Sequence, residues 1–247
     1  MPSGDTMMTH LRQTARSLAI QALSLRKLGA KLQPGIRFVC YHDVFKQEVG
    51  ALKSQLLQLG ELGDFISLDR AIGLMQAQSP LDRPLFTITF DDGLATTHQQ
   101  AWPLMEQLGI PLSTFLITSF VGQPGYMSWE DARQMVASQL VTIGSHTVNH
   151  RNLKQLSGDE VRFELASSKA RIEEALGKNC DHFCCPWGRP DRDFRVDRDP
   201  AIALKLGYKS FLTTRRGLTR TGDKLPLVKR DVIGMDASRA ELRHFLY

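Results

Sequence analysis

Two adjacent carboxylates, Asp91 and Asp92, follow a run of β-branched and aromatic residues. The run Phe86–Phe90 lies between Pro84 and Gly93, a pattern typical of a buried strand whose carboxyl end presents acidic side chains to a cleft. Two like charges side by side are costly unless a positive group lies close to them. A bound metal ion would supply that positive charge.

His146 and His150 follow another short strand-like run, Val141–Gly144. Histidines four positions apart can face one metal ion from a helical turn or a tight loop, and one carboxylate would complete a site that stays open to water and substrate. Such a site suits hydrolysis, which also needs a base and an acid. Each signal alone is weak, because such histidine pairs are more often surface residues and Asp-Asp-Gly is more often a turn. Their shared place after strands favours a metal site.

Strand-like and helix-like segments alternate about seven times along the chain. The strand-like segments cover residues 36–41, 86–90, 113–118, 141–144, 183–186, 210–213 and 227–232. Patterns in which Ser128 precedes Asp131, and Ser157 precedes Glu160, predict the starts of two helices. The alternation predicts an α/β fold with a parallel sheet, closed into a barrel or doubly wound. Polar or aromatic residues follow the strand ends, where barrel enzymes keep their active sites: His42, Asp91, Asp92, His146, Trp187 and Arg230.

The composition is that of a globular protein, with 42% hydrophobic and 23% charged residues. No run of ~18 apolar residues is present, which argues against a transmembrane helix. Residues 1–31 carry five basic groups and one acid, hence +4 of the net charge of +5, so a broad nucleic-acid-binding surface is not expected. Four cysteines do not form a disulfide framework, and the lack of a signal peptide favours a cytoplasmic location.

Residues 8–30 have the spacing of an amphipathic helix, and we expect residues 1–34 to precede a single domain over 35–247. The other face of this helix carries arginines, so it could lie on the inner face of an anionic membrane. The alternative is a helix packed on the domain or a mobile arm. The alternative is favoured, because the apolar stripe lacks Trp and Phe: Leu11, Ala15, Leu18, Ala22 and Leu25.

Three motifs resemble those of the polysaccharide deacetylases, the NodB-homology domain of carbohydrate esterase family 4. They are Thr89–Gly93, Ser145–His150 and Cys185–Gly188, and the resemblance covers roughly residues 36–235. It implies a distorted (β/α)7 barrel and a metal held by Asp92, His146 and His150. The metal would be zinc, with cobalt, nickel and iron as alternatives. Asp91 would be the catalytic base, and Pro186 and Trp187 would form a wall of the sugar site.

The chain departs from the family pattern at two places. Many members carry an arginine where this chain has Cys184; Arg230 could supply that charge to orient the base, with Arg189 as a competitor. The usual late Leu-x-His motif is missing, since His244 is the only histidine after residue 190. The early Tyr41-His42-Asp43 instead resembles that of poly-N-acetylglucosamine deacetylases, in which the motif order is circularly permuted. This resemblance implies His42 as the acid and Tyr41 as a substrate contact.

The expected activity is removal of N-acetyl groups from a sugar, with release of acetate. The same site could act on O-acetyl esters or on a non-sugar amide, because family resemblance fixes the bond type better than the substrate. A silent carbohydrate-binding domain is the alternative from another class, and the presence of every expected ligand disfavours it. His98 and His182 are expected to be solvated or core residues, and a second metal at the cysteines is disfavoured because their spacing is wrong for a zinc ribbon.

Overall fold

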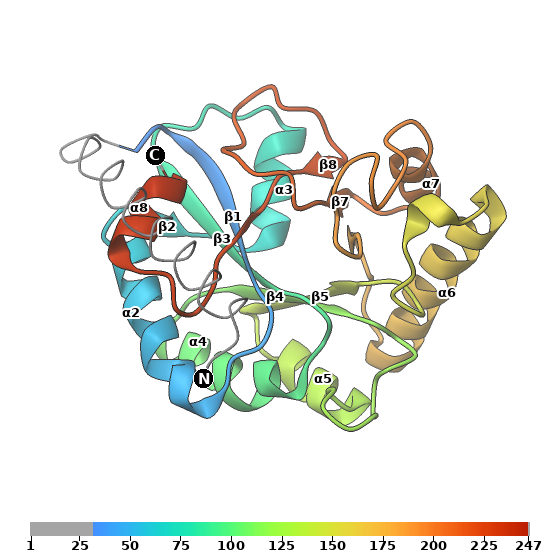
Figure 1. Ribbon diagram of the computed structural model, residues 1–247, viewed down its shortest axis with the longest axis horizontal. Coiled ribbons are helices and arrows are strands. Elements are labelled where there is room, and N and C mark those ends of the chain that lie inside the picture. Colours follow the sequence, from blue (N-terminus) through green and yellow to red (C-terminus); the bar gives the residue numbers. More distant parts are fainter. Residues whose placement is uncertain (1–31, 247) are drawn as a thin grey trace, which may run out of the picture. The chain divides into compact units, whose positions relative to one another are not determined.

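The computed structural model describes residues 32–246, and Figure 1 shows the course of the chain. Residues Pro34–Met235 form one compact unit. Helix α8 (Arg239–Leu246) belongs to a second unit, and Ser238 caps its amino end by accepting a hydrogen bond from Glu241 N. No helix within residues 32–246 has the length and apolarity needed to cross a membrane. The helix expected over 8–30 lies outside the described residues.

A parallel sheet forms the centre of the unit 34–235, with the strand order β8-β7-β6-β5-β4-β3-β1-β9 and β2 paired to β3. The strands are β1 (Gly35–Tyr41), β2 (Asp64–Phe65), β3 (Pro84–Phe90), β4 (Leu112–Leu116), β5 (Val141–Ser145), β6 (His182–Cys184), β7 (Ser210–Leu212), β8 (Leu227–Val228) and β9 (Asp231–Val232). The sheet curls into the expected distorted (β/α)7 barrel. Parallel pairing follows from the helical crossovers between successive strands.

Helices surround the outside of this sheet, as Figure 1 shows for α2, α4, α5 and α6. The helices of the unit are α2 (Val49–Gly60), α3 (Leu68–Gln76), α4 (Trp102–Leu108), α5 (Trp129–Ala137), α6 (Gly158–Leu176) and α7 (Asp199–Lys205). Both predicted capping boxes are confirmed, because Ser128 and Ser157 each accept from the backbone N–H three residues on. Gly109 and Gly177 end α4 and α6 in the left-handed conformation, as glycine at that position allows.

Helix α3 packs its apolar face into the same hydrophobic cluster as the strands. Its buried residues contact a core that includes Phe38, Phe115 and Leu212. At the first turn, Asp69 accepts hydrogen bonds from Thr142, near the start of β5, and pairs with His182, the first residue of β6. Helix α3 therefore closes the amino ends of the strands, while the carboxyl ends stay open.

The single strand expected over residues 227–232 is wrong. Two short strands replace it: β8 pairs with β7, whereas β9 pairs with β1. Between them the Arg230 amide bonds to Arg215 O and its side chain turns into the interior. The chain must pass from one edge of the sheet to the other at this point, so one continuous ladder is impossible.

Candidate active site

The end of β3 sends its two carboxylates in different directions. Asp92 and Gly93 both adopt positive φ, 68° and 70°. A Cβ at Gly93 would lie 2.8 Å from Leu116 Cδ2, so this close turn favours glycine. Asp91 is 3% exposed and faces the interior, whereas the Asp92 side chain is 25% exposed. The turn therefore gives the adjacent acids separate environments.

Arg230 holds Asp91 in a bidentate ion pair. Its Nη1 and Nη2 donate to Asp91 Oδ1 and Oδ2, each over 2.7 Å, and both side chains are buried. Burial alone would raise the pKa of Asp91, but the Arg230 guanidinium holds the pKa of this carboxyl well below its usual range. The competitor Arg189 instead pairs with Asp193, at 2.7 Å. The structure therefore brings Arg230, and not Arg189, to the predicted base.

The remaining donors of Arg230 are also satisfied. Nε donates to Thr213 O, Nη1 also donates to Thr89 Oγ1, and Nη2 also donates to Cys184 Sγ, over 2.9–3.2 Å. The thiols of Cys40 and Cys184 lie 3.5 and 3.4 Å from Asp91 Oδ2. Burial raises the pKa of both thiols, so each stays protonated and donates to the carboxylate. Sequence reasoning missed Cys40 in this cluster; its signal was its place two residues before His42.

Asp92, His146 and His150 form a group that fits a divalent metal. His146 Nε2 and His150 Nε2 lie 3.4 and 3.5 Å from the same oxygen, Asp92 Oδ1. His146 Nδ1 is 2.8 Å from Cys184 O, and a carbonyl only accepts, so Nδ1 carries a proton and Nε2 is the nitrogen left to bind a metal. Both Nε2 atoms thus converge on one carboxylate oxygen, as the ligands of a metal ion do. The donor set of two nitrogens and one oxygen is that of an open zinc site.

The environment of His150 also keeps it available as a ligand. Burial, followed by the nearby His146, lowers the pKa of His150 to about 4. The imidazole is therefore neutral at pH 7. Its backbone N–H donates to Thr147 Oγ1 over 2.8 Å, which holds a tight loop rather than a helical turn. Thr147 and His150 both have positive φ; strain of this kind is concentrated at functional sites.

Glu164 on α6 holds the histidine loop, and sequence reasoning missed it. Its Oε2 accepts from the Val148 and Asn149 amides over 2.9 Å, and its Oε1 accepts from Asn149 Nδ2 over 2.8 Å. Glu164 is buried among the apolar residues of its helix. A carboxylate on the apolar face of an amphipathic helix was the signal that could have found it, because such a charge requires partners.

A pocket of about 450 Å³ brings the predicted residues together at the carboxyl ends of the strands. Trp187, which is 48% exposed, forms part of its wall, and the centroids of the Trp187 and His150 rings lie 4.7 Å apart. His42 also lines the pocket, with a ring nitrogen within 4.8 Å of a carboxylate oxygen of Asp91. The lining residues are His42, Asp91, Asp92, His146, His150, Trp187, Arg189, Thr214 and Val232.

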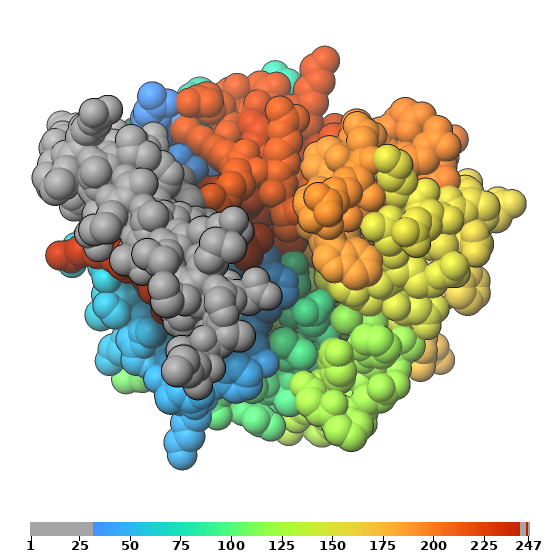
Figure 2. All heavy atoms as spheres, viewed as in Figure 1, coloured from blue at the N-terminus to red at the C-terminus, as the bar shows by residue number. Residues whose placement is uncertain are grey.

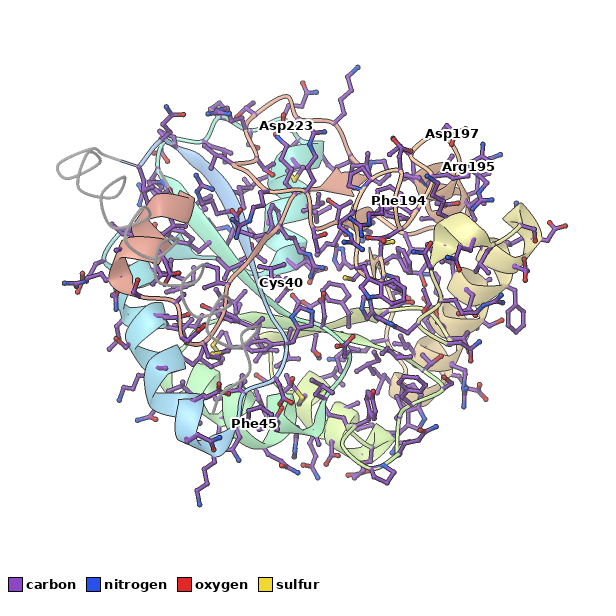
Figure 3. All side chains as sticks on the ribbon, viewed as in Figure 1. Cys40, Phe45, Phe194, Arg195, Asp197 and Asp223 are labelled. Atoms are coloured by element: carbon purple, nitrogen blue, oxygen red, sulfur yellow. The ribbon has the colours of Figure 1, made fainter. Side chains whose placement is uncertain are left out.

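Tyr41 and Pro186 do not line this pocket. Tyr41 is 1% exposed, stacks on Phe90 and donates its hydroxyl to Gln55 Oε1 over 2.9 Å. The expected substrate contact at Tyr41 is therefore wrong, because alternation along β1 turns it away from the side of Cys40 and His42. Pro186 is buried beside the exposed Trp187. Figure 3 labels Cys40, near the carboxyl end of β1, close to the middle of the view.

Comparisons with solved structures show the same fold in other proteins. A structure of IcaB from Ammonifex degensii is 26% identical, covers 87% of this chain and 98% of that one, and has a TM-score of 0.74. The Streptococcus pyogenes deacetylase PplD, solved in complex with acetate, is 22% identical, with 87% and 100% coverage and a TM-score of 0.75. At 22% identity, the likeness to PplD supports the fold alone.

Comparisons of sequence give the family. YxkH of Bacillus subtilis (strain 168) is 27% identical over 149 residues, which are 60% of this chain and 51% of YxkH. The poly-β-1,6-N-acetyl-D-glucosamine N-deacetylase of Escherichia coli (strain K12) is 23% identical, over 72% of this chain and 32% of that enzyme. The chain thus spans about half of the length of YxkH and about a third of the length of the Escherichia coli enzyme. The family model described as polysaccharide deacetylase matches residues 78–210, more than half of the chain, and the chain therefore belongs to the polysaccharide deacetylase family.

Proposed function

We propose that this chain is a metal-dependent hydrolase that removes N-acetyl groups from an N-acetylated sugar and releases acetate. One observation carries the proposal. A single pocket is lined by a carboxylate fixed by a buried arginine, by three side chains that fit a divalent metal, and by a further histidine. Hydrolysis of an amide needs these three elements: a base, an electrophile and an acid.

Asp92, His146 and His150 would hold the metal, for which zinc is our first choice from the two nitrogens and one oxygen. When bound, such an ion acidifies a water and polarises the carbonyl of the acetyl group. Cys184 O orients His146 through Nδ1, and Glu164 holds the loop that carries His150. These contacts preset the positions of the ligands, as outer partners of metal ligands commonly do.

Asp91 is the base in this proposal, and Arg230 orients it. The bidentate pair fixes both carboxylate oxygens, and the low pKa keeps Asp91 ionised at neutral pH. His42 faces the same pocket from the end of β1 and gives a proton to the leaving amine. The pairing of β1 with β3 supports this assignment, because it brings His42 near Asp91 at one strand end.

Trp187 offers the apolar ring on which a pyranose would lie. The relative from Escherichia coli acts on a polymer of N-acetylglucosamine, which supports an amide bond on an amino sugar as the target. An O-acetyl ester on a sugar would fit the same machinery, so the first measurement must separate the two bonds.

The test is acetate release from N-acetylglucosamine oligomers and from matched O-acetylated sugars. We expect release from the N-acetylated substrate, its loss after chelation, and its return when Zn²⁺ or Co²⁺ is added. The Asp92→Asn variant serves as the control, since metal addition should not restore it fully. Equal turnover before and after chelation would contradict metal dependence, and release from the O-acetylated sugar alone would move the activity to esters.

A further inference from the structure

A second cavity of about 290 Å³ lies next to the catalytic pocket, between two loops. One wall comes from the loop between β6 and α7, with Pro190 and Val196, and the other from residues 213–229. Figure 2 shows these two segments, orange and red-orange, side by side on one face, and Figure 3 labels Phe194 and Asp223 on them. The established motifs of the chain do not account for this cavity.

Each of the two loops lines both cavities, through residues that are consecutive in the chain. Arg189 lines the catalytic pocket and Pro190 lines the second cavity. On the other loop Thr214 lines the catalytic pocket, whereas Thr213 and Arg215 line the second cavity. The loops meet where Thr214 N donates to Gly188 O over 2.9 Å. The two cavities therefore share the walls formed by these two loops.

Three cations and one carboxylate line the second cavity. Lys229 Nζ pairs with Asp223 Oδ2 over 2.9 Å, so these two charges offset each other. Arg215 and Lys224 are exposed, and neither has an ion-pair partner among residues 32–246. The cavity therefore has an excess of two positive charges, while its other lining residues are threonines and apolar side chains.

We propose that the second cavity binds the diphosphate of a diphosphate-linked N-acetylated sugar. A diphosphate bridge carries two negative charges, which match the two unpaired cations, whereas a uronic acid unit would bring one. Arg215 suits phosphate oxygens through its planar fork of donors, and Lys224 adds a point charge. This assignment rests on the proposed deacetylase function, and it makes the substrate a carrier-linked precursor rather than a neutral polymer.

Binding of inorganic pyrophosphate to the intact protein, followed by calorimetry, tests the cavity without any need for turnover. The double variant Arg215→Gln/Lys224→Gln should bind it roughly tenfold more weakly. The matched control Lys53→Gln/Arg171→Gln removes one lysine and one arginine from exposed positions on α2 and α6 and should bind as the wild type does. Asp92→Asn should bind pyrophosphate as the wild type does. Pyrophosphate held at the metal ligands would instead be lost in this variant, so the variant separates the two sites.

Three results for pyrophosphate binding would each overturn the proposal. They are equal affinity in the wild type and the Arg215/Lys224 variant, loss of binding in Asp92→Asn, and no binding to the wild type. A second measurement compares acetate release from a nucleotide-diphosphate N-acetyl sugar, a lipid-diphosphate N-acetyl sugar and a neutral N-acetyl oligomer. We expect one of the two diphosphates to be preferred, which identifies the carrier, and the double variant to lose that preference while keeping turnover of the neutral oligomer.

An unchanged preference in the double variant would also overturn the proposal. No acetate from any of the three substrates would instead count against the deacetylase function, while the pyrophosphate affinities would still decide whether the cavity binds the anion. The two failures are thus distinguishable.

Discussion

Two clusters of aspartate and histidine lie at opposite ends of the same barrel. At the carboxyl ends of the strands, Asp92 meets His146 and His150. At the amino ends, Asp69 meets His182, and His182 also meets Ser210. The two clusters contain similar residue types, yet only the first lies in the catalytic pocket.

Hydrogen-bond saturation separates the two clusters. His182 is 1% exposed, and both ring nitrogens have partners: Nε2 with Asp69 Oδ1 at 3.1 Å and Nδ1 with Ser210 Oγ at 2.8 Å. In the catalytic cluster the Nε2 atoms face a carboxylate oxygen at 3.4–3.5 Å, too far for a good hydrogen bond and suited to an ion between them. The convergence of two ring nitrogens on one carboxylate oxygen at these distances, rather than the residue types, distinguishes the candidate site.

The largest expected effect is on the base. Asp91→Asn should lower turnover by about 10²–10⁴-fold, because the proton acceptor is lost. It should also lower the free energy of unfolding by about 3 kcal/mol or more, since Arg230 is left buried without its counter-charge. Metal content, measured by elemental analysis, should stay near one ion per chain; loss of the metal would assign Asp91 to the ligand set.

Paired alanine substitutions test the contrast between the two histidine clusters. His146→Ala should lose metal and activity, and it should also lower the unfolding temperature, because its buried ring bonds to Cys184 O. His182→Ala should keep metal but lose about 2–4 kcal/mol of unfolding free energy, because two buried hydrogen bonds and the packing of the ring disappear. Denaturant unfolding with metal analysis on both variants decides the matter, and metal loss in His182→Ala would break the contrast.

His42→Ala should lower turnover by roughly 10²-fold without changing metal content, since a general acid contributes at least this much. The exposed position of His42 also predicts an unchanged unfolding temperature. His98→Ala is the matched control, because His98 bonds to Gln134 away from the pocket. Full turnover by His42→Ala would leave the acid unassigned.

The smallest expected effect concerns pH and Asp69. The His182 hydrogen bond lowers the pKa of Asp69 to about 2, from an unfolded value of about 3.9. A depressed pKa stabilises the fold above the unfolded value, and this stabilisation is lost as pH falls from about 4 to 2. Because the Asp69 side chain is 55% exposed, the gain over Asp69→Asn at pH 6 should be under about 1 kcal/mol.

Denaturant midpoints at several pH values check this prediction. The difference between the wild type and Asp69→Asn should narrow as pH falls toward 2. A difference that stays constant with pH would mean that the carboxylate charge contributes nothing to the amino-end cluster.

Local patterns determined much of the fold. Capping boxes and alternating segments predicted most helices and strands, because each depends on neighbours in the chain. The carboxylates Asp91 and Asp92 and the histidine pair were found for the same reason, since each lies directly after a strand and strand ends share one face of a barrel.

Contacts between distant residues were decided by the tertiary structure alone. The sequence left Arg189 and Arg230 as alternatives for the residue that orients Asp91. Only the split between β8 and β9 showed which of the two reaches this carboxylate. Tyr41 was misassigned for a related reason: the side of β1 that faces the cleft depends on pairing with β3.

The sequence by itself therefore determined the family, the alternation of elements and most of the residues that line the candidate active site. The tertiary structure decided which ring nitrogens converge on Asp92, which arginine is buried beside Asp91, and that Glu164 holds the histidine loop. The physical reason is that types and spacings follow from local propensity and periodicity, whereas burial and hydrogen-bond saturation depend on groups far apart in the chain.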